Sequence, residues 1–298
     1  MLYLYKGSVP DFIHNAQLQI FASQLEAEFV RRFGYETTKK EVASWRNSLR
    51  ALSFVLQDTR FQHCHILLEF KMPTCSSRCD AIVTGEDSSG NAQAVVVELK
   101  QWQFVRPSAV RDHVTTSGYN SLHASAQARQ YCEYLHYYHK ACTSQRVRIS
   151  GCAYLHNLSD KKSIAVLNDP SIFGVLHKEY PVFTAENVPA FQTYLASKVG
   201  NGGGAEIADE LINGGIEPST KLLDVVSEVI KQDFEWRLID EQLTAFATVI
   251  SEVESLKDKS GKAILLVRGG PGTGKSVLAI QLLAYAAGKH WRVAHASG

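Results

Sequence analysis

The sequence lacks the features that mark membrane and secreted proteins. None of its apolar runs approaches the roughly 20 residues that a membrane-spanning helix needs. The first residues, MLYLYKGSVPDF, do not combine a basic segment, an apolar segment and a small-residue cleavage site, so they do not indicate a signal peptide. We therefore expect a cytoplasmic protein with no membrane partner.

Closely spaced cysteine pairs and a strong net charge are also missing. The six cysteines include no CxxC pair, which is typical of reduced thiols, so we expect no disulfide. The net charge of +1 gives no global basic field that would attract nucleic acid. Basic residues between positions 31 and 50 are interpreted as a solvated helix face. One cluster has the residue types of a zinc site but the spacing of no common zinc module, so a packing role is preferred for His63, His65, Cys75 and Cys79.

Length and composition indicate two soluble domains. A chain of 298 residues exceeds the roughly 100 to 200 residues that one core usually serves, and 45% hydrophobic residues are ordinary for a globular protein. The run GNGGG at 200–204 interrupts every periodic pattern. We expect a first domain over 1–200, a linker and helical connector over 201–232, and a second domain over 233–298.

The first domain has the pattern of an α/β fold with a mixed central sheet flanked by helices. Helical spacing and strand-like runs alternate along it, and turn-rich segments separate the first three strands, which predicts a meander. The predicted helices are 14–33, 39–57, 121–139 and 187–199, and the predicted strands are 65–73, 78–85, 94–102 and 147–157.

The second domain reads as the start of a P-loop NTPase. Helical patterns at 219–232 and 238–254 precede a strand at 263–267, a glycine loop and a helix at 276–287. A second strand begins near 291, and a parallel strand needs neighbours to pair its backbone. We therefore expect an incomplete nucleotide-binding domain in a chain that is a piece of a longer protein.

The loop GGPGTGKS matches the phosphate-binding pattern G-x-x-x-x-G-K-[ST] in its required strand–loop–helix context. Gly269, Gly272 and Gly274 allow backbone N–H groups to turn toward the phosphates of ATP. Lys275 supplies a charge to the β- and γ-phosphates, and Ser276 can bind magnesium.

The stretch AVVVELKQW places two charges on a strand that is otherwise apolar. Glu98 and Lys100 are two residues apart and so share one face. A meander brings Asp80 of the preceding strand beside Glu98. Two converging carboxylates repel each other, and a divalent cation such as Mg²⁺ or Mn²⁺ removes that cost, with Asp80 and Glu98 as its ligands. Lys100 can then orient the attacking water. Arg78 shares the face of Asp80, where it either contacts phosphate or neutralises Asp80.

The arrangement D-(x)n-E-x-K resembles the signature of the PD-(D/E)xK nucleases. On the following helix, Gln127 and Tyr131 form the Q-x-x-x-Y of the RecB-like branch, which implies that they help to hold nucleic acid and the active site. The resemblance also implies that an acid from the first helix completes the metal site, and Glu41 in EVASWRNSL is the candidate. The alternative for Glu41 is a plain N-terminal acid favoured by the helix dipole. Glu69 is a second candidate, or an outward-facing strand residue.

Over the whole chain, the segments EVASWRNSL, RCDAIVTG, VVVELKQW, HASAQARQY and PSTKLLD, followed by the phosphate loop, resemble bacterial proteins that join such a nuclease to a Schlafen-group-three-like DNA/RNA helicase domain. FEWRLIDEQLTAF resembles the start of a superfamily-one helicase motor. Gln242 there matches a glutamine that reads adenine, and a solvent-facing helix residue is the alternative. His123-Ala124 departs from the expected His-Pro, which alters a helix start and leaves open whether His123 faces the site.

We therefore expect a Mg²⁺- or Mn²⁺-dependent nuclease that acts on DNA rather than RNA. In the intact protein, the resemblance implies coupling to an ATP-dependent helicase, in phage defence or DNA repair. This chain has no room for a Walker B acid, so we do not expect it to hydrolyse ATP. Two alternatives remain: a catalytically inactive nucleic-acid-binding or sensing module, and an ATP-binding protein whose first domain docks partners. Strand type and homo-oligomer formation stay open.

Overall fold

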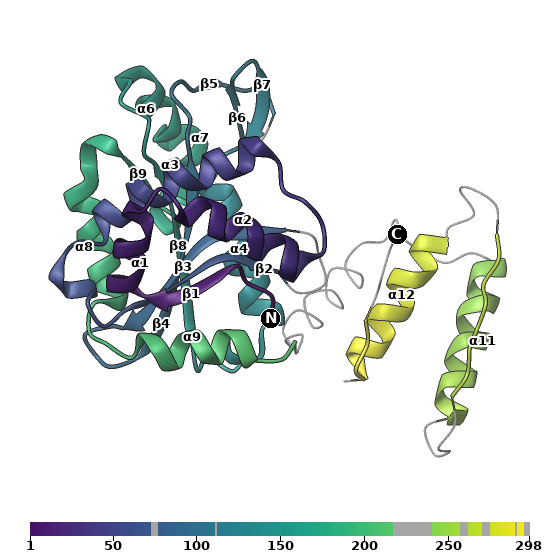
Figure 1. Cartoon of the computed structure of the whole chain (residues 1–298). Helices are drawn as coiled ribbons and strands as arrows, with labels where there is room; N and C mark the ends of the chain where they lie inside the picture. Colours follow the sequence, from purple (N-terminus) through teal and green to yellow (C-terminus); the bar gives the residue numbers. More distant parts are fainter. Residues whose placement is uncertain are drawn as a thin grey trace. The chain divides into compact units, whose positions relative to one another are not determined.

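The computed structural model describes residues 1–72, 77–110, 112–216, 240–256, 262–269, 275–289 and 291–294 (Figure 1). The chain divides into two compact units, Met1–Glu217 and Pro218–Gly298. The first unit contains the sheet and the candidate site. No described helix combines the length and the apolar character needed to cross a membrane.

A six-stranded mixed sheet forms the centre of the first unit. Its spatial order is β1-β2-β3-β4-β8-β9, in which β1 to β4 are antiparallel neighbours while β4, β8 and β9 run parallel. The predicted α/β class, the meander and the strand at 147–157 are therefore confirmed. The strands are β1 Tyr5–Ser8, β2 His65–Lys71, β3 Arg78–Glu86, β4 Ala92–Lys100, β8 Arg148–Leu155 and β9 Val182–Thr184.

Four helices cover one face of the sheet: α1 Val9–Gln17, α2 Phe21–Phe33, α3 Lys39–Val55 and α8 Val188–Val199. Thr38 caps the N-terminus of α3, since its hydroxyl accepts a hydrogen bond from the Glu41 N–H, and the apolar positions of α3 face the sheet. The predicted single helix over 14–33 is wrong. Leu18 adopts an extended conformation that ends α1. Because the helix is interrupted there, Phe12 of α1 and Leu25 of α2 both pack in the same core.

The other face of the sheet is covered by α4 Ala124–Tyr138 and α9 Gly204–Asn213. Residues 204–213 belong to the predicted linker and helical connector; they do form a helix, and its Ile207, Ala208 and Leu211 are buried against the sheet. Gly204 permits this approach, because a Cβ there would lie 2.4 Å from the His65 nitrogen. The compact unit therefore continues past the predicted boundary at residue 200.

A small three-stranded sheet is inserted between β4 and α4, and the sequence patterns did not predict it. It consists of β5 Arg106–Pro107, β6 His113–Thr116 and β7 Tyr119–Leu122. Val105 and Val114 anchor it in a third core with residues of helices α6 and α7. The remaining elements of this unit are α5 Lys140–Thr143, α6 Lys161–Leu167, α7 Pro170–Glu179 and the 3-10 turns η1 Thr59–Phe61 and η2 Ala185–Asn187.

In the second unit, α11 Asp240–Leu256 and α12 Lys275–Gly288 occupy the predicted helical segments. The predicted strand at 263–267 is not formed, and residues 291–294 also have no regular structure. A strand needs a partner for its backbone hydrogen bonds, and no described segment pairs with either stretch. The helix predicted at 219–232 lies outside the described residues.

Candidate active site

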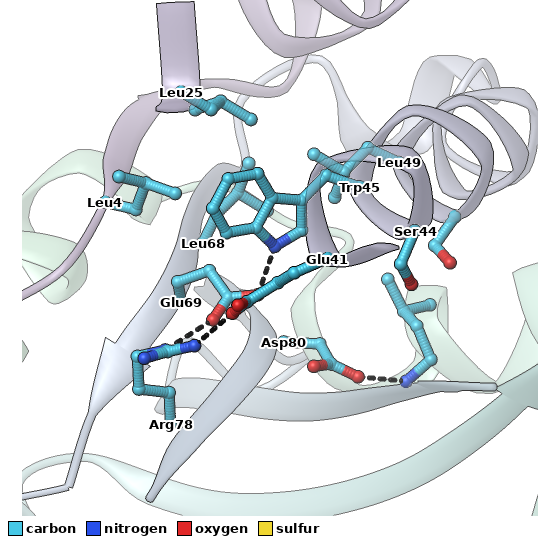
Figure 2. Close-up of a pocket in the computed structure, with 12 residues that line it drawn as sticks. Leu4, Leu25, Glu41, Ser44, Trp45, Leu49, Leu68, Glu69, Arg78 and Asp80 are labelled. Carbon is cyan, nitrogen blue, oxygen red and sulfur yellow. Dashed lines mark hydrogen bonds and ion pairs between the residues drawn. The ribbon is translucent and has the colours of Figure 1, made fainter. Parts of the chain in front are cut away.

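The candidate site lies where β3 and β4 separate. The two strands pair as far as Ala81 and Val97, after which Glu98 to Lys100 pair only with β8 on the opposite edge of β4. At this fork the Asp80 carboxylate accepts a hydrogen bond from the Leu99 N–H at 2.7 Å (Figure 2). The Leu99 N–H thus bonds to a side-chain oxygen instead of a carbonyl oxygen of the neighbouring strand. This bond fixes Asp80 beside the end of β4.

Four of the predicted site residues form one chain of contacts on the α4 face of the sheet. The Lys100 Nζ lies 2.7 Å from Glu98 Oε1 and donates to Gln127 Oε1 at 2.9 Å. Gln127 Nε2 in turn donates to the Tyr131 hydroxyl at 3.0 Å. Gln127 and Tyr131 meet because residues four apart on a helix lie one above the other. The structure therefore places the E-x-K strand against the Q-x-x-x-Y helix.

Glu98 is an incompletely satisfied charge. Its side chain is only 1% exposed, and its second oxygen, Oε2, is buried without a hydrogen-bond partner among the described groups. Leaving a charged buried oxygen unpaired costs a few kcal/mol, so such atoms are rare and mark a missing proton or ligand. Lys100 neutralises one side of this carboxylate and leaves the other open.

The pKa shifts of Glu98 and Asp80 also indicate that a proton or a cation is needed beside Glu98 Oε2. Burial and the nearby charge of Asp80 raise the pKa of Glu98 to about 8, against the opposing effect of Lys100. Burial also raises the pKa of Asp80, although Lys100, the Leu99 N–H and a hydrogen bond with the Glu98 side chain lower it in part, and that hydrogen bond requires a proton on one of the two acids. Burial lowers the pKa of Lys100, but the two carboxylates outweigh this and leave it raised. The metal-free pair therefore retains a proton at neutral pH, and a cation would displace it.

On the α3 face, Glu69 occupies an unusual backbone position. Its φ of 49° lies in the left-handed region, which costs a non-glycine residue about 1 kcal/mol or more. This angle breaks the alternation of β2: Leu67 and Phe70 both face the α4 side, and Glu69 turns toward α3. There Glu69 Oε1 accepts from Trp45 Nε1 at 2.7 Å, and Oε2 accepts from Arg78 Nε at 2.7 Å (Figure 2).

Arg78 closes an ion-pair network on this α3 face. It also donates to Glu41, whose other oxygen accepts from the Thr37 hydroxyl at 2.6 Å. Burial and the Asp80 charge raise the pKa of Glu69 to about 7, and Arg78 opposes that shift. Both oxygens of Glu41 and of Glu69 are thus engaged. Arg78 therefore holds both candidates for completing the metal site, and Glu69 also interacts through its charge with Asp80 and Glu98.

A cavity of about 250 Å³ opens beside Asp80 on the α3 face. Its lining combines apolar side chains, among them Leu25 and Leu68, with the charged side chains of the Arg78 network (Figure 2). Glu98 and Lys100 do not line it. Asp80 lines this cavity, and its carboxyl group also interacts with Glu98 and Lys100 of the contact chain on the other face.

Asp80 and Glu98 are the two carboxylates available for a cation. Among the residues that the structure describes, no three His, Cys, Asp or Glu side chains are grouped to hold a metal ion. That statement covers His63, His65 and Cys79, whereas Cys75 lies outside the described residues. A two-carboxylate site suits Mg²⁺, which usually keeps several waters and takes its remaining ligands from substrate phosphate.

Sequence patterns missed a polar cluster next to this site. Gln101 Nε2 donates to the hydroxyls of Ser44 and Ser48 at 2.9 and 3.1 Å, and Ser48 contacts His156 Nε2 at 3.0 Å. The available signal was the position of Gln101 directly after the E-x-K residues. His123 does not join the site: it caps α4, and its ring contacts the Leu167 carbonyl at 3.2 Å.

The nucleotide-binding candidates are only partly described. Lys275 begins α12 and donates to the Gly269 carbonyl at 2.8 Å. Gln242 is half-buried on α11. Gly272 and Gly274 lie outside the described residues, and the side chain of Ser276 is not described.

Comparison with known proteins identifies no relative of this chain. No protein-family model matches the chain, and neither a curated protein nor a solved structure matches it.

Proposed function

We propose that the first unit is a divalent-cation-dependent nuclease whose active site lies at the fork of β3 and β4. One observation carries the proposal: Glu98 Oε2 is buried without a hydrogen-bond partner among the described groups, on a carboxylate that contacts a positioned ammonium and feels the charge of Asp80. A purely structural ion pair would satisfy both oxygens, as Glu69 does on the other face. An acid with one open oxygen suits a ligand that is bound during function.

The chemistry of these donors fits a hard cation. Asp80 and Glu98 would hold Mg²⁺ or Mn²⁺, and the bound cation would supply positive charge to a phosphodiester and to its attacking water. The Leu99 N–H holds one oxygen of Asp80 in place, and Lys100 holds one oxygen of Glu98. Both carboxylates are therefore oriented before any cation arrives.

Lys100 has a donor left for the substrate. An ammonium carries three N–H groups, and within the described part of the chain two of those of Lys100 are directed at Glu98 and Gln127. The third can donate to a non-bridging phosphate oxygen or to the attacking water. As the phosphorus–oxygen bond to the leaving strand breaks, Lys100 offsets the negative charge that develops on the phosphate.

The finer assignments belong to the same proposal. The E-x-K strand against a Q-x-x-x-Y helix supports a PD-(D/E)xK core of the RecB-like type, with DNA favoured over RNA as substrate. The phosphate-loop sequence supports ATP binding by a complete form of the second unit. A nuclease joined to such an ATP-binding unit would be coupled to a helicase motor and would act in phage defence or DNA repair.

A cleavage assay tests the nuclease. Single- and double-stranded DNA and RNA are incubated with Mg²⁺ or Mn²⁺ and the wild type, Glu98→Gln or Lys100→Met. The partners of an ion pair away from the site, the half-buried Lys6 and the exposed Asp209, are changed in Lys6→Met and Asp209→Asn as matched controls. We expect cation-dependent cleavage by the wild type and both controls, and none by the two site variants. Equal cleavage by all five proteins would contradict the proposal, and binding in EDTA without any cleavage would favour the inactive binding module.

A further inference from the structure

The exposed side of α3 carries a row of cations. Its members share helical spacing and solvent exposure, and we call them the α3 stripe: Lys39, Lys40, Arg46 and Arg50. Helix α3 contains a single acid, Glu41, and both of its oxygens are engaged, by Arg78 and Thr37. The stripe therefore has no acid on its own helix that is free to neutralise it.

Other elements do not neutralise the α3 stripe either. Within the described part of the chain, no ion pair joins any of its four cations to an Asp or Glu. Other exposed arginines of the first unit are paired with acids: Arg31 with Glu28, Arg60 with Asp58 and Arg146 with Glu210. Since the net charge of the whole chain is only +1, the stripe is a local concentration of positive charge that attracts a polyanion.

The α3 stripe borders the candidate site. The adjoining side of the same helix lines the cavity beside Asp80 through Glu41 and Ser44 (Figure 2). Gln101, the residue after Lys100, donates to the Ser44 hydroxyl at 2.9 Å. Helix α3 is thus bonded to the end of β4, and a strand that lies along its exposed side would reach the fork.

The apolar side of α3 argues against a membrane as the partner. A basic amphipathic helix binds a membrane by inserting its apolar side into the lipid. In α3 that side is buried in the protein core, with Val42, Trp45 and Leu49 among its residues. A nucleic acid needs no apolar contact, because lysine and arginine bind its regular row of phosphates whatever the base sequence.

We propose that the α3 stripe binds the backbone phosphates of a nucleic acid that extends from the fork of β3 and β4. The clause about the fork rests on the proposed function. From Lys39 to Arg50 the stripe is about 16 Å long, at roughly 1.5 Å per residue, and so spans several phosphates of one strand. The substrate is therefore a strand or duplex that continues several nucleotides beyond the cleaved bond, bound there without sequence preference. The spacing of these cations alone indicates only a solvated helix face.

Equilibrium binding at several salt concentrations tests the inference without cleavage. The full chain in EDTA is titrated against a fluorescein-labelled DNA duplex, a DNA single strand and an RNA single strand, and log Kd is plotted against log salt concentration. For the nucleic acid that binds most tightly, we expect Arg46→Gln/Arg50→Gln to raise the Kd about tenfold or more at low salt. The slope should fall by about 1.4–1.8, because each phosphate contact contributes roughly 0.7–0.9. Arg46→Lys/Arg50→Lys keeps both charges and should keep the slope.

Arg146→Gln/Arg148→Gln is the matched control. It removes the same charge from two exposed arginines at the other end of β4, where Arg148 is paired with Gln93. We expect the slope of this variant to equal that of the wild type. Similar losses of slope in the two glutamine variants would show that binding follows net charge alone, and would overturn the inference.

The remaining outcomes separate this inference from the nuclease. A smaller slope in Arg46→Gln/Arg50→Gln alone supports the α3 stripe even if no protein cleaves a strand, and in that case only the proposed function fails. An unchanged slope in this variant would overturn the inference, while cleavage by the wild type would still support the nuclease. A wild type that binds none of the three nucleic acids would also overturn it, and binding of phosphatidylserine vesicles in their place would indicate a membrane partner instead.

Discussion

The two faces of the sheet at the fork carry similar charges in different arrangements. On the α3 face, the guanidinium of Arg78 bonds to both Glu41 and Glu69, and every oxygen of these acids is engaged. On the α4 face, one ammonium faces two acids, and Glu98 Oε2 has no hydrogen-bond partner in the described part of the chain. On the α3 face, the protein itself supplies a partner to every carboxylate oxygen. On the α4 face, Glu98 Oε2 obtains one only from a further cation or proton.

This difference indicates that the charges on the α3 face stabilise the fold, and it supports the proposal that those on the α4 face bind a ligand. Burial of a charge is tolerated when the charge is paired and its hydrogen bonds are made. The Arg78 network meets that condition, and its guanidinium also packs 4.7 Å from the centre of the Phe29 ring. The Glu98 side does not meet it. Their contacts give Glu41, Glu69 and Arg78 a structural role, whereas the proposed nuclease places its chemistry at Asp80, Glu98 and Lys100.

The largest effect expected from this comparison is on stability. Arg78→Met leaves the buried Glu69 without its cation and should lower the free energy of unfolding by about 3–5 kcal/mol. Arg60→Met breaks the exposed pair with Asp58 and should cost less than about 1 kcal/mol. Urea denaturation followed by circular dichroism measures both. Similar losses in the two variants would show that the Arg78 network does not stabilise the fold more than a surface pair does.

The next effect is on turnover. Lys100→Met should lower kcat for cleavage on the order of a hundredfold or more, as is typical when a group that stabilises developing charge is removed. Arg78→Met, assayed under conditions where it is folded, should keep kcat within a few-fold of the wild type. Steady-state kinetics on one labelled substrate compares them. A larger loss of kcat in Arg78→Met than in Lys100→Met would reverse the assignment of the two faces.

A smaller effect concerns the pH dependence of metal-free stability. The pKa of Glu98 is about 8 in the folded state and 4.5 as the unperturbed value, so the folded state binds more protons between these pH values. Stability should therefore fall as pH rises through this window, by at most about 1.4 kcal/mol per pH unit for one group. For Glu69 the fall should end near pH 7, because its pKa is about 7.

Urea denaturation in EDTA at several pH values separates the two acids. Glu98→Gln should flatten the slope between pH 7 and pH 8, whereas Glu69→Gln should leave the slope in that interval nearly intact. An unchanged slope in Glu98→Gln would mean that Glu98 does not retain a proton in the folded protein.

The smallest effect expected is that of a positioning residue. Tyr131→Phe removes the hydroxyl that accepts from Gln127, a hydrogen bond that typically contributes about 1 kcal/mol. Gln127 then holds Lys100 less firmly, and we expect kcat to fall about fivefold with KM unchanged. Tyr137→Phe on the same helix should change neither. A rise in KM with constant kcat would place Tyr131 in substrate binding instead.

Local patterns were sufficient to predict the contact chain on the α4 face. The i, i+2 spacing of Glu98 and Lys100 and the i, i+4 spacing of Gln127 and Tyr131 are properties of strands and helices, and the structure keeps both. Buried valines around Glu98 indicated a core strand, and β4 is one. Residues whose positions depend on one element were thus accessible from the sequence.

The α3 face required information that the sequence pattern does not contain. Glu69 faces Trp45 only because its own φ is positive, which reverses the alternation of β2. Arg78 shares a strand with Asp80, yet its hydrogen bonds go to Glu41 and Glu69 on other elements. The small sheet was missed because β5 spans only Arg106–Pro107, too short for a periodic signal. These features depend on tertiary contacts.

We propose that Asp80 and Glu98 hold a divalent cation. Titration with Mn²⁺, followed by electron paramagnetic resonance, tests this most directly. Free Mn²⁺ gives a sharp signal that bound Mn²⁺ loses, and no substrate or turnover is needed. We predict that the wild type and Glu69→Gln bind Mn²⁺ alike, with release of protons, and that Glu98→Gln does not. Absence of Mn²⁺ binding by the wild type, or equal binding by Glu98→Gln, would contradict the claim.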